Sequence, residues 1–127
     1  MNIPQAAPAP SERARVLSTA VVEAARRLGL RSTELTAIIG TSQPSASRLL
    51  NGKYLIPEGS KTWELSAHFV RLYRSVSSLV GGNDELARLW LKSPNRAFDD
   101  RQPLDVVKRV DGLLNVCAYL DAHRALV

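Results

Sequence analysis

Residues 32–53, STELTAIIGTSQPSASRLLNGK, contain two short helical patterns joined by a glycine. Ser32 is placed to cap the first helix, and the apolar residues that follow share one helical face. Those residues are Leu35, Ile38 and Ile39. Gly40 supplies the positive φ that a tight turn requires at low steric cost. The stretch therefore predicts a helix, a turn and a second helix.

The second helix is expected to start at Ser42, with Pro44 in its first turn, and to end at Asn51-Gly52. It buries Ala46, Leu49 and Leu50 and exposes short polar side chains and one arginine. Such side chains on a second helix can reach base edges and phosphates in a major groove. The candidate DNA contacts are Gln43, Ser45, Ser47, Arg48 and Lys53.

Arg48 is the strongest of these candidates, because an arginine can bind guanine bidentately or hold a phosphate. Lys53 lies just past the helix and is expected to touch phosphate. Gln43, Ser45 and Ser47 could read bases or only cap and solvate the helix. Helix-turn-helix patterns are degenerate, and an ordinary helical hairpin would show the same periodicity.

The rest of the chain also has helical periodicity, and no segment shows the alternation of a strand. Ser11 and Ser60 are placed to cap long helices, and Asn83 a shorter one. The helices expected outside the motif cover residues 11–28, 60–80, 84–91 and 104–110, and a terminal helix opens at Asp111 or Gly112. We therefore predict an all-α fold, preceded by a flexible arm over residues 1–10.

The composition excludes several classes of protein. The 127 residues carry 17 Lys and Arg against 12 Asp and Glu, a net charge of +5 that suits phosphate binding without requiring it. Cys117 is the single cysteine, and with only two histidines beside it no ordinary zinc site is expected. A single cysteine allows no intramolecular disulfide, so we expect the reducing cytoplasm. No apolar run approaches the roughly 20 residues of a membrane span. No catalytic constellation is present, so we expect neither an enzyme nor a cofactor.

Two segments of the second half are punctuated more strongly than a generic helix: residues 87–98, ARLWLKSPNRAF, and residues 101–107, RQPLDVV. Pro94 ends a helix, and Phe98 is expected to pin the following loop onto the core. Pro103 then starts the next helix with its φ already set. From the residues alone this is a helix–loop–helix.

The chain resembles a known family in both halves. Residues 34–42, ELTAIIGTS, and 47–53, SRLLNGK, look like the helix-turn-helix of Xre-type regulators. The two punctuated segments, followed by Gly112-Leu113, are similar to the toxin-binding domain of the Xre/MbcA/ParS antitoxins. The resemblance runs from about Leu28 to the C-terminus.

The chain departs from the family pattern at two places. Thr36 stands where the family usually has alanine, and Ala46 where it usually has Ile or Val. Asp99-Asp100 stands where many relatives carry one or two glycines. Asp at those positions restricts the loop to negative φ or to the left-handed conformation that Asp sometimes tolerates.

The resemblance implies an Xre-like helix-turn-helix bundle over residues 11–59 and a helical dimerisation and toxin-binding region over residues 60–127. It implies a type II antitoxin that blocks the active site of a RES-domain, NAD-degrading toxin and represses its own operon. The blocking segment would be residues 119–127, YLDAHRALV, which in an arbitrary protein would be only the end of the last helix. The candidate toxin contacts are Tyr119, His123, Arg124, Leu126 and Val127.

The alternative is a stand-alone dimeric Xre-family repressor with no enzyme partner. In both cases the expected partners include operator double-stranded DNA and a second copy of the chain. A single helix-turn-helix buries too little surface for tight specific binding, so a two-fold dimer on a palindromic site is expected.

Overall fold

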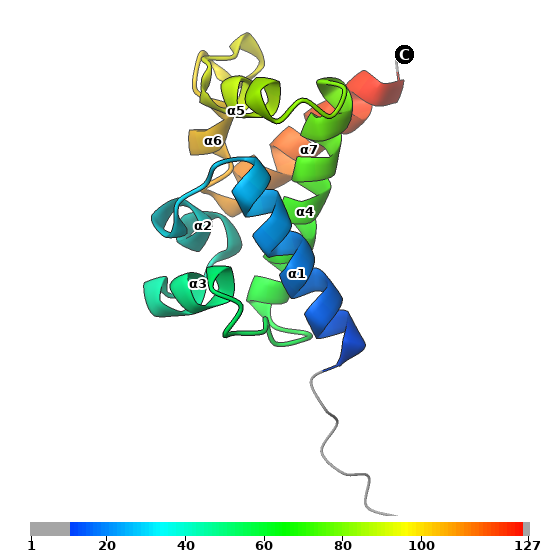
Figure 1. Cartoon of the computed structure of the whole chain (residues 1–127). Helices are drawn as coiled ribbons and strands as arrows, with labels where there is room; N and C mark the ends of the chain where they lie inside the picture. Colours follow the sequence, from blue (N-terminus) through cyan, green and yellow to red (C-terminus); the bar gives the residue numbers. More distant parts are fainter. Residues whose placement is uncertain (1–10, 126–127) are drawn as a thin grey trace, which may run out of the picture.

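In the computed structural model, residues 11–125 are described, with side chains described through Arg124. Figure 1 shows seven α-helices in this part of the chain. They are α1 (Glu12–Arg27), α2 (Ser32–Ile39), α3 (Gln43–Leu50), α4 (Lys61–Leu79), α5 (Asp84–Lys92), α6 (Pro103–Val106) and α7 (Val110–Ala125), with one 3-10 turn, η1 (Arg96–Phe98), between α5 and α6. No strand occurs within residues 11–125. The predicted all-α fold is confirmed, while the predicted arm over residues 1–10 lies outside the described residues.

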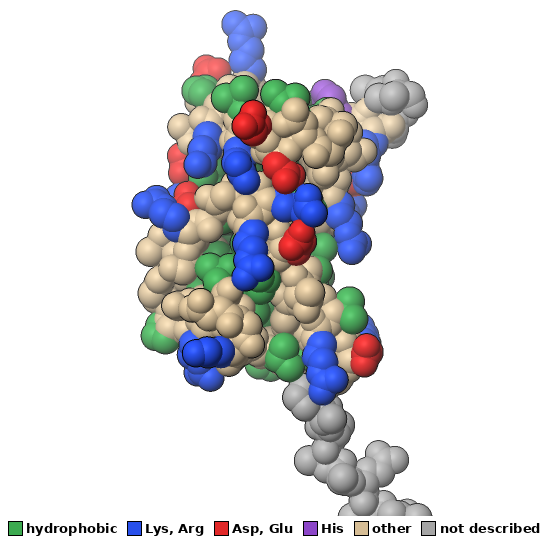
Figure 2. Space-filling model, in the orientation of Figure 1, with side chains coloured by type: hydrophobic (Ala, Val, Ile, Leu, Met, Phe, Trp, Pro, Cys, Tyr) green, Lys and Arg blue, Asp and Glu red, His purple; other side chains and the backbone are tan. Residues whose placement is uncertain are grey.

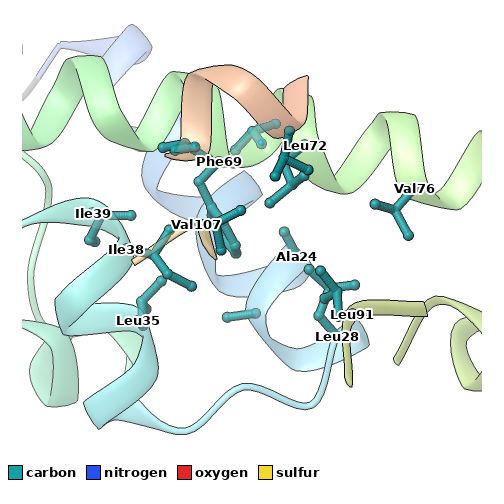
Figure 3. Packing of buried hydrophobic residues seen from close by; sticks show 14 of the residues in the cluster. Ala24, Leu28, Leu35, Ile38, Ile39, Phe69, Leu72, Val76, Leu91 and Val107 are labelled. Atoms are coloured by element: carbon teal, nitrogen blue, oxygen red, sulfur yellow. The ribbon is translucent and has the colours of Figure 1, made fainter. Parts of the chain in front are cut away.

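The central helix is α4, against which α1, α2, α5 and α7 all pack (Figure 1). Phe69, Leu72 and Val76 of α4 are 1% exposed or less. Figure 3 shows these side chains in one cluster with buried residues of the neighbouring helices. Among them are Ala24 and Leu28 of α1, Ile38 of α2 and Leu91 of α5. The helix-turn-helix and the C-terminal helices therefore share one hydrophobic core.

Four helices begin as their capping residues predict. The Ser11, Ser42 and Ser60 hydroxyls each accept a hydrogen bond from the backbone N–H three residues later, at 3.0–3.2 Å. The Asn83 side chain does the same for Leu86 at 3.1 Å. Each cap satisfies a backbone donor that the helix itself leaves free.

The prediction that Ser32 caps α2 is wrong. The capping position is Arg31, and Ser32 is the first helical residue. The Glu34 carboxylate accepts the Arg31 backbone N–H at 2.9 Å, so a side chain inside the helix satisfies this donor. The Ser32 hydroxyl is thereby left for another contact.

The loop between α5 and α6 adopts a left-handed conformation without glycine. Asp99 and Asp100 have φ of 58° and 62°. The Asn95 carbonyl accepts hydrogen bonds from Phe98 N at 2.9 Å and from Asp100 N at 3.0 Å, which closes the turn. Phe98 is buried against the core, as predicted.

The predicted helix over residues 104–110 is shorter than expected. α6 ends at Val106, and α7 begins at Val110 rather than at residue 111 or 112. A Cβ at Gly112 would lie 1.9 Å from the Val106 carbonyl oxygen. The first turn of α7 therefore occupies the space in which α6 would continue, and only glycine allows this approach.

No helix among the described residues is both long enough and apolar enough to cross a bilayer.

Leu50, predicted to be buried, is only half-buried at the end of α3.

We expect Gly112→Ala to lower the free energy of unfolding by about 1–3 kcal/mol, because the added methyl group forces α6 and α7 apart. Alanine is the better helix former, so a purely local effect would have the opposite sign. Chemical denaturation measures the change. Asn115→Ala, at an exposed position of the same helix, is the control and should stay within about 0.5 kcal/mol of the parent. A Gly112→Ala protein as stable as the parent would contradict the close approach.

Candidate functional site

The helix-turn-helix is held against α4 at its turn. Gly40 adopts φ 67° and its N–H donates to the Thr36 carbonyl at 3.0 Å. Thr62 of α4 donates its hydroxyl to the Gly40 carbonyl at 3.0 Å. The turn that joins α2 to α3 is therefore fixed to the central helix.

A hydrogen-bonded network joins the N-terminal ends of α2 and α3. The Gln43 amide nitrogen donates to the Ser32 hydroxyl at 2.7 Å. The Thr36 hydroxyl donates to the Ser32 carbonyl at 2.8 Å and lies 3.2 Å from the Gln43 amide oxygen. Thr36, one of the departures from the family pattern, thus contacts α3. Ala46, the other departure in the helix-turn-helix, is fully buried on α3.

The other candidate DNA contacts lie along the same helix. Ser47, Arg48 and Lys53 are exposed, as is Gln43, while Ser45 is half-buried. The Ser45 hydroxyl accepts a hydrogen bond from that of Ser42 at 2.9 Å. The structure therefore brings all five predicted residues onto α3 and the turn after it.

The guanidinium group of Arg48 lies over an aromatic ring. Its guanidinium carbon lies 5.7 Å from the centre of the Tyr54 ring, within the range of a cation–π interaction. The Lys53 backbone N–H donates to the Arg48 carbonyl at 2.8 Å. Arg48 and Lys53 therefore both lie at the C-terminal end of α3, whereas Gln43 lies at its N-terminal end.

The candidate toxin contacts begin in the core and end outside it. Tyr119 is half-buried and packs edge-to-face on Phe98, with ring centres 5.2 Å apart. The Tyr119 and His123 rings lie 4.4 Å apart, and Phe98 also meets Trp90 at 6.5 Å. This aromatic row, Trp90–Phe98–Tyr119–His123, connects α5 to the end of α7.

Residues after Asp121 leave the core. Leu120 is 1% exposed, whereas His123 and Arg124 are exposed. Asp121 pairs with Arg71 of α4 and with Arg124, the latter at 3.0 Å. Leu126 and Val127, also predicted toxin contacts, lie outside the described residues. The core thus anchors the segment through residue 121.

The aromatic row links this segment to an apolar ridge on α5. It consists of Leu86, Leu89 and Trp90, of which the two leucines are 47% and 62% exposed. Together with Val80 and Pro94 the ridge borders a hollow of about 340 Å³. Figure 2 shows apolar side chains and a histidine at the upper end of the molecule. Periodicity placed the three residues on one helical face, but only the structure shows that this face is uncovered.

Within the described residues, no group of three or more His, Cys, Asp or Glu side chains lies close enough together to hold a metal ion. Cys117 is buried, and burial raises the pKa of its thiol. Its sulfur lies 3.6 Å from the His68 carbonyl.

Two family matches divide the chain between these surfaces. Residues 7–71 match the antitoxin Xre-like helix-turn-helix domain, and residues 75–125 match the antitoxin Xre/MbcA/ParS C-terminal toxin-binding domain. No curated protein matches the chain. Among solved structures, the chain is similar to one in the crystal structure of the M. tuberculosis MbcT-MbcA toxin-antitoxin complex. The identity is 29% and the TM-score 0.62, covering 84% of this chain and 92% of that chain.

We expect Glu34→Gln to destabilise the protein by about 0.5–1 kcal/mol at pH 7, because it removes a charge at the α2 N-terminus. Burial disfavours ionisation of Glu34, but its hydrogen bonds with Arg31 and the charges of Arg31 and Lys92 outweigh it, so its pKa is lowered. The stability from a lowered pKa is present above the unfolded-state value of about 4.3 and is lost as pH falls.

Urea denaturation from pH 7 to pH 3 tests this expectation, and the gap between parent and Glu34→Gln should close toward acid. Glu64→Gln is the control, since Glu64 lies in the first turn of α4 in an exposed pair with Lys61 at 3.1 Å. A gap that is constant with pH would contradict the role of the Glu34 charge.

Proposed function

Because the chain belongs to the antitoxin family with an Xre-like helix-turn-helix and carries the Xre/MbcA/ParS toxin-binding domain, we propose that it neutralises a toxin enzyme and represses its own operon. The proposed toxin is a RES-domain enzyme that degrades NAD. The chain itself would be non-enzymatic and act in the cytoplasm, where operator DNA lies. One observation carries the proposal: the toxin-binding domain ends in an exposed segment that a row of aromatic contacts links to an exposed apolar ridge.

The proposed inhibitory contact is a plug, formed by the residues that follow Asp121. Tyr119 and Leu120 pack against the core. This packing fixes the position at which the exposed end of α7 begins. His123 and Arg124 offer polar and cationic groups to a cleft that accepts a dinucleotide. The ridge on α5 would pack against the apolar rim of that cleft, since exposed apolar patches mark interaction sites. The similar M. tuberculosis chain comes from a toxin–antitoxin complex, which supports a protein partner.

The proposed repressor activity uses the exposed side chains of α3. Arg48 would bind guanine or a phosphate, and its support by Tyr54 limits the freedom that it loses on binding. Two copies of the chain would place two recognition helices on the half-sites of a palindromic operator. A stand-alone repressor would share this DNA contact but would leave the α5 ridge uncovered.

We expect removal of residues 122–127 to abolish inhibition of the toxin while leaving the fold intact. The cut retains Leu120 and the Asp121–Arg71 pair, whereas a cut before Tyr119 would remove core residues. The measurement is NAD consumption by the purified toxin as the antitoxin is titrated in, with circular dichroism to check the fold. Full inhibition by the shortened chain would exclude the plug.

We expect Leu89→Ser to weaken toxin binding by about tenfold, because a buried leucine side chain contributes about 1.5–3 kcal/mol and only part of it is recovered at an interface. Calorimetric titration with the toxin measures the loss. Leu114→Ser is matched, since Leu114 is 43% exposed on α7 outside the ridge. Equal effects of the two substitutions would exclude the ridge as a toxin contact.

We expect Arg48→Ala to weaken operator binding by about 1–3 kcal/mol while leaving binding to unrelated DNA much less affected. Fluorescence anisotropy with both DNAs at one salt concentration measures this. Arg74→Ala, which removes an arginine from the groove between α1 and α4, is the control. An unchanged operator preference would rule out α3 as the reading helix.

A further inference from the structure

A basic hollow of about 430 Å³ lies beside the start of α2, where the two family domains meet. Arg31 and Glu34 line it from the helix-turn-helix side. From the toxin-binding domain the lining includes Lys92 at the end of α5 and Gln102, Asp105 and Lys108 around α6. Figure 1 shows α6 next to α2 on the side of the molecule that carries α3. The toxin-binding domain thus adds lysines to a surface continuous with the helix-turn-helix.

The hollow borders the end of α2 that contacts the recognition helix. The Gln43–Ser32 hydrogen bond, at 2.7 Å, joins the first turn of α3 to the first turn of α2. Arg31 directly precedes that turn of α2 and lines the hollow. When a recognition helix enters a major groove, the first helix of the motif crosses the DNA backbone. The hollow would then lie over phosphates that flank the half-site.

The charges that reach solvent in the hollow are mainly positive. The Arg31 side chain is 79% exposed, whereas that of its partner Glu34 is 11% exposed. Lys92 is exposed and makes no ion pair with any described residue. Lys108 pairs with Asp105 at 3.3 Å, the one exposed carboxylate here. Figure 2 shows Lys and Arg side chains over α5, α6 and the start of α2.

These lysines make few contacts within the fold, although the charge of Lys92 also favours the ionised form of Glu34. Exposed ion pairs contribute about 0–1 kcal/mol to stability, and Lys92 has no such pair among the described residues. Lysine is a flexible point charge that suits contact with phosphate. The arrangement therefore fits a polyanion better than a structural role.

We infer that Lys92 and Lys108 of the toxin-binding domain bind DNA phosphates beside the operator half-site, together with Arg31. This inference rests on the proposed operator binding. It extends the DNA contact beyond the helix-turn-helix to residues that the family match assigns to toxin binding.

The test is the salt dependence of DNA binding by the full chain. Each phosphate contact contributes about 0.9 to the slope of log K against log salt concentration. The probes are the chain's own upstream DNA and an unrelated duplex, measured by anisotropy from 50 to 300 mM NaCl. Lys92→Ala/Lys108→Ala should reduce the magnitude of the slope by about 1–2 for each chain bound. It should lower the affinity of the chain for the two DNAs by the same factor. Lys92→Arg/Lys108→Arg should restore the slope.

Two comparisons make the result decisive. Arg13→Ala/Arg74→Ala removes the same charge from the groove between α1 and α4 and should leave the slope unchanged. An equal fall in slope for both double variants would overturn the inference, because net charge alone would explain it. If Lys92→Ala/Lys108→Ala leaves the slope of the parent unchanged, the inference is overturned, whereas the proposed repressor function is not.

If the parent chain shows no preference for its upstream DNA, the proposed repressor function is overturned, and the inference with it. Loss of toxin affinity at an unchanged slope would reassign the lysines to the toxin and overturn the inference.

Discussion

The rest of the structure depends on the burial of α4 from several sides. Phe69, Leu72 and Val76 are almost completely removed from water, and helices from both ends of the chain cover them. Apolar burial is the dominant favourable term in folding, so these helices stabilise one another through α4. The two family matches end at residue 71 and begin at residue 75, inside this helix. The predicted division at residues 59 and 60 remains a prediction, but the core itself is continuous across both matches.

Much of the fold could be predicted because helix starts are governed by local chemistry. Ser11, Ser42, Ser60 and Asn83 each cap a helix as their sequence positions indicate. Local reasoning was wrong where another residue competed for a backbone group or where two backbone segments came into contact. The Glu34 carboxylate accepts the Arg31 backbone N–H, and Ser32 is the first residue of the helix rather than its cap. The early end of α6 depends on the close approach of Gly112 to the Val106 carbonyl, a contact that helical periodicity does not reveal.

The sequence predicted which residues lie on the candidate surfaces, but not the contacts that hold these residues in place. The pattern placed Arg48 and Lys53 at the end of the recognition helix, but helical periodicity does not reveal that the Arg48 guanidinium lies over the Tyr54 ring. The Trp90–Phe98–Tyr119–His123 row joins segments that are far apart in sequence. Its geometry depends on a turn in which two aspartates adopt positive φ, a conformation that composition alone could not assign. The assignment of each residue to DNA or toxin stays a prediction.

The network of Ser32, Thr36 and Gln43 also bears on how such a regulator diverges after gene duplication. The direction of the Gln43 amide is set by two residues of α2, through contacts at 2.7 and 3.2 Å. A substitution at Ser32 or Thr36 releases that amide without altering any side chain of α3. If Gln43 contacts bases as predicted, two paralogues could acquire separate operator preferences while their recognition helices remain identical. In an alignment of α3 alone, such a pair would look interchangeable.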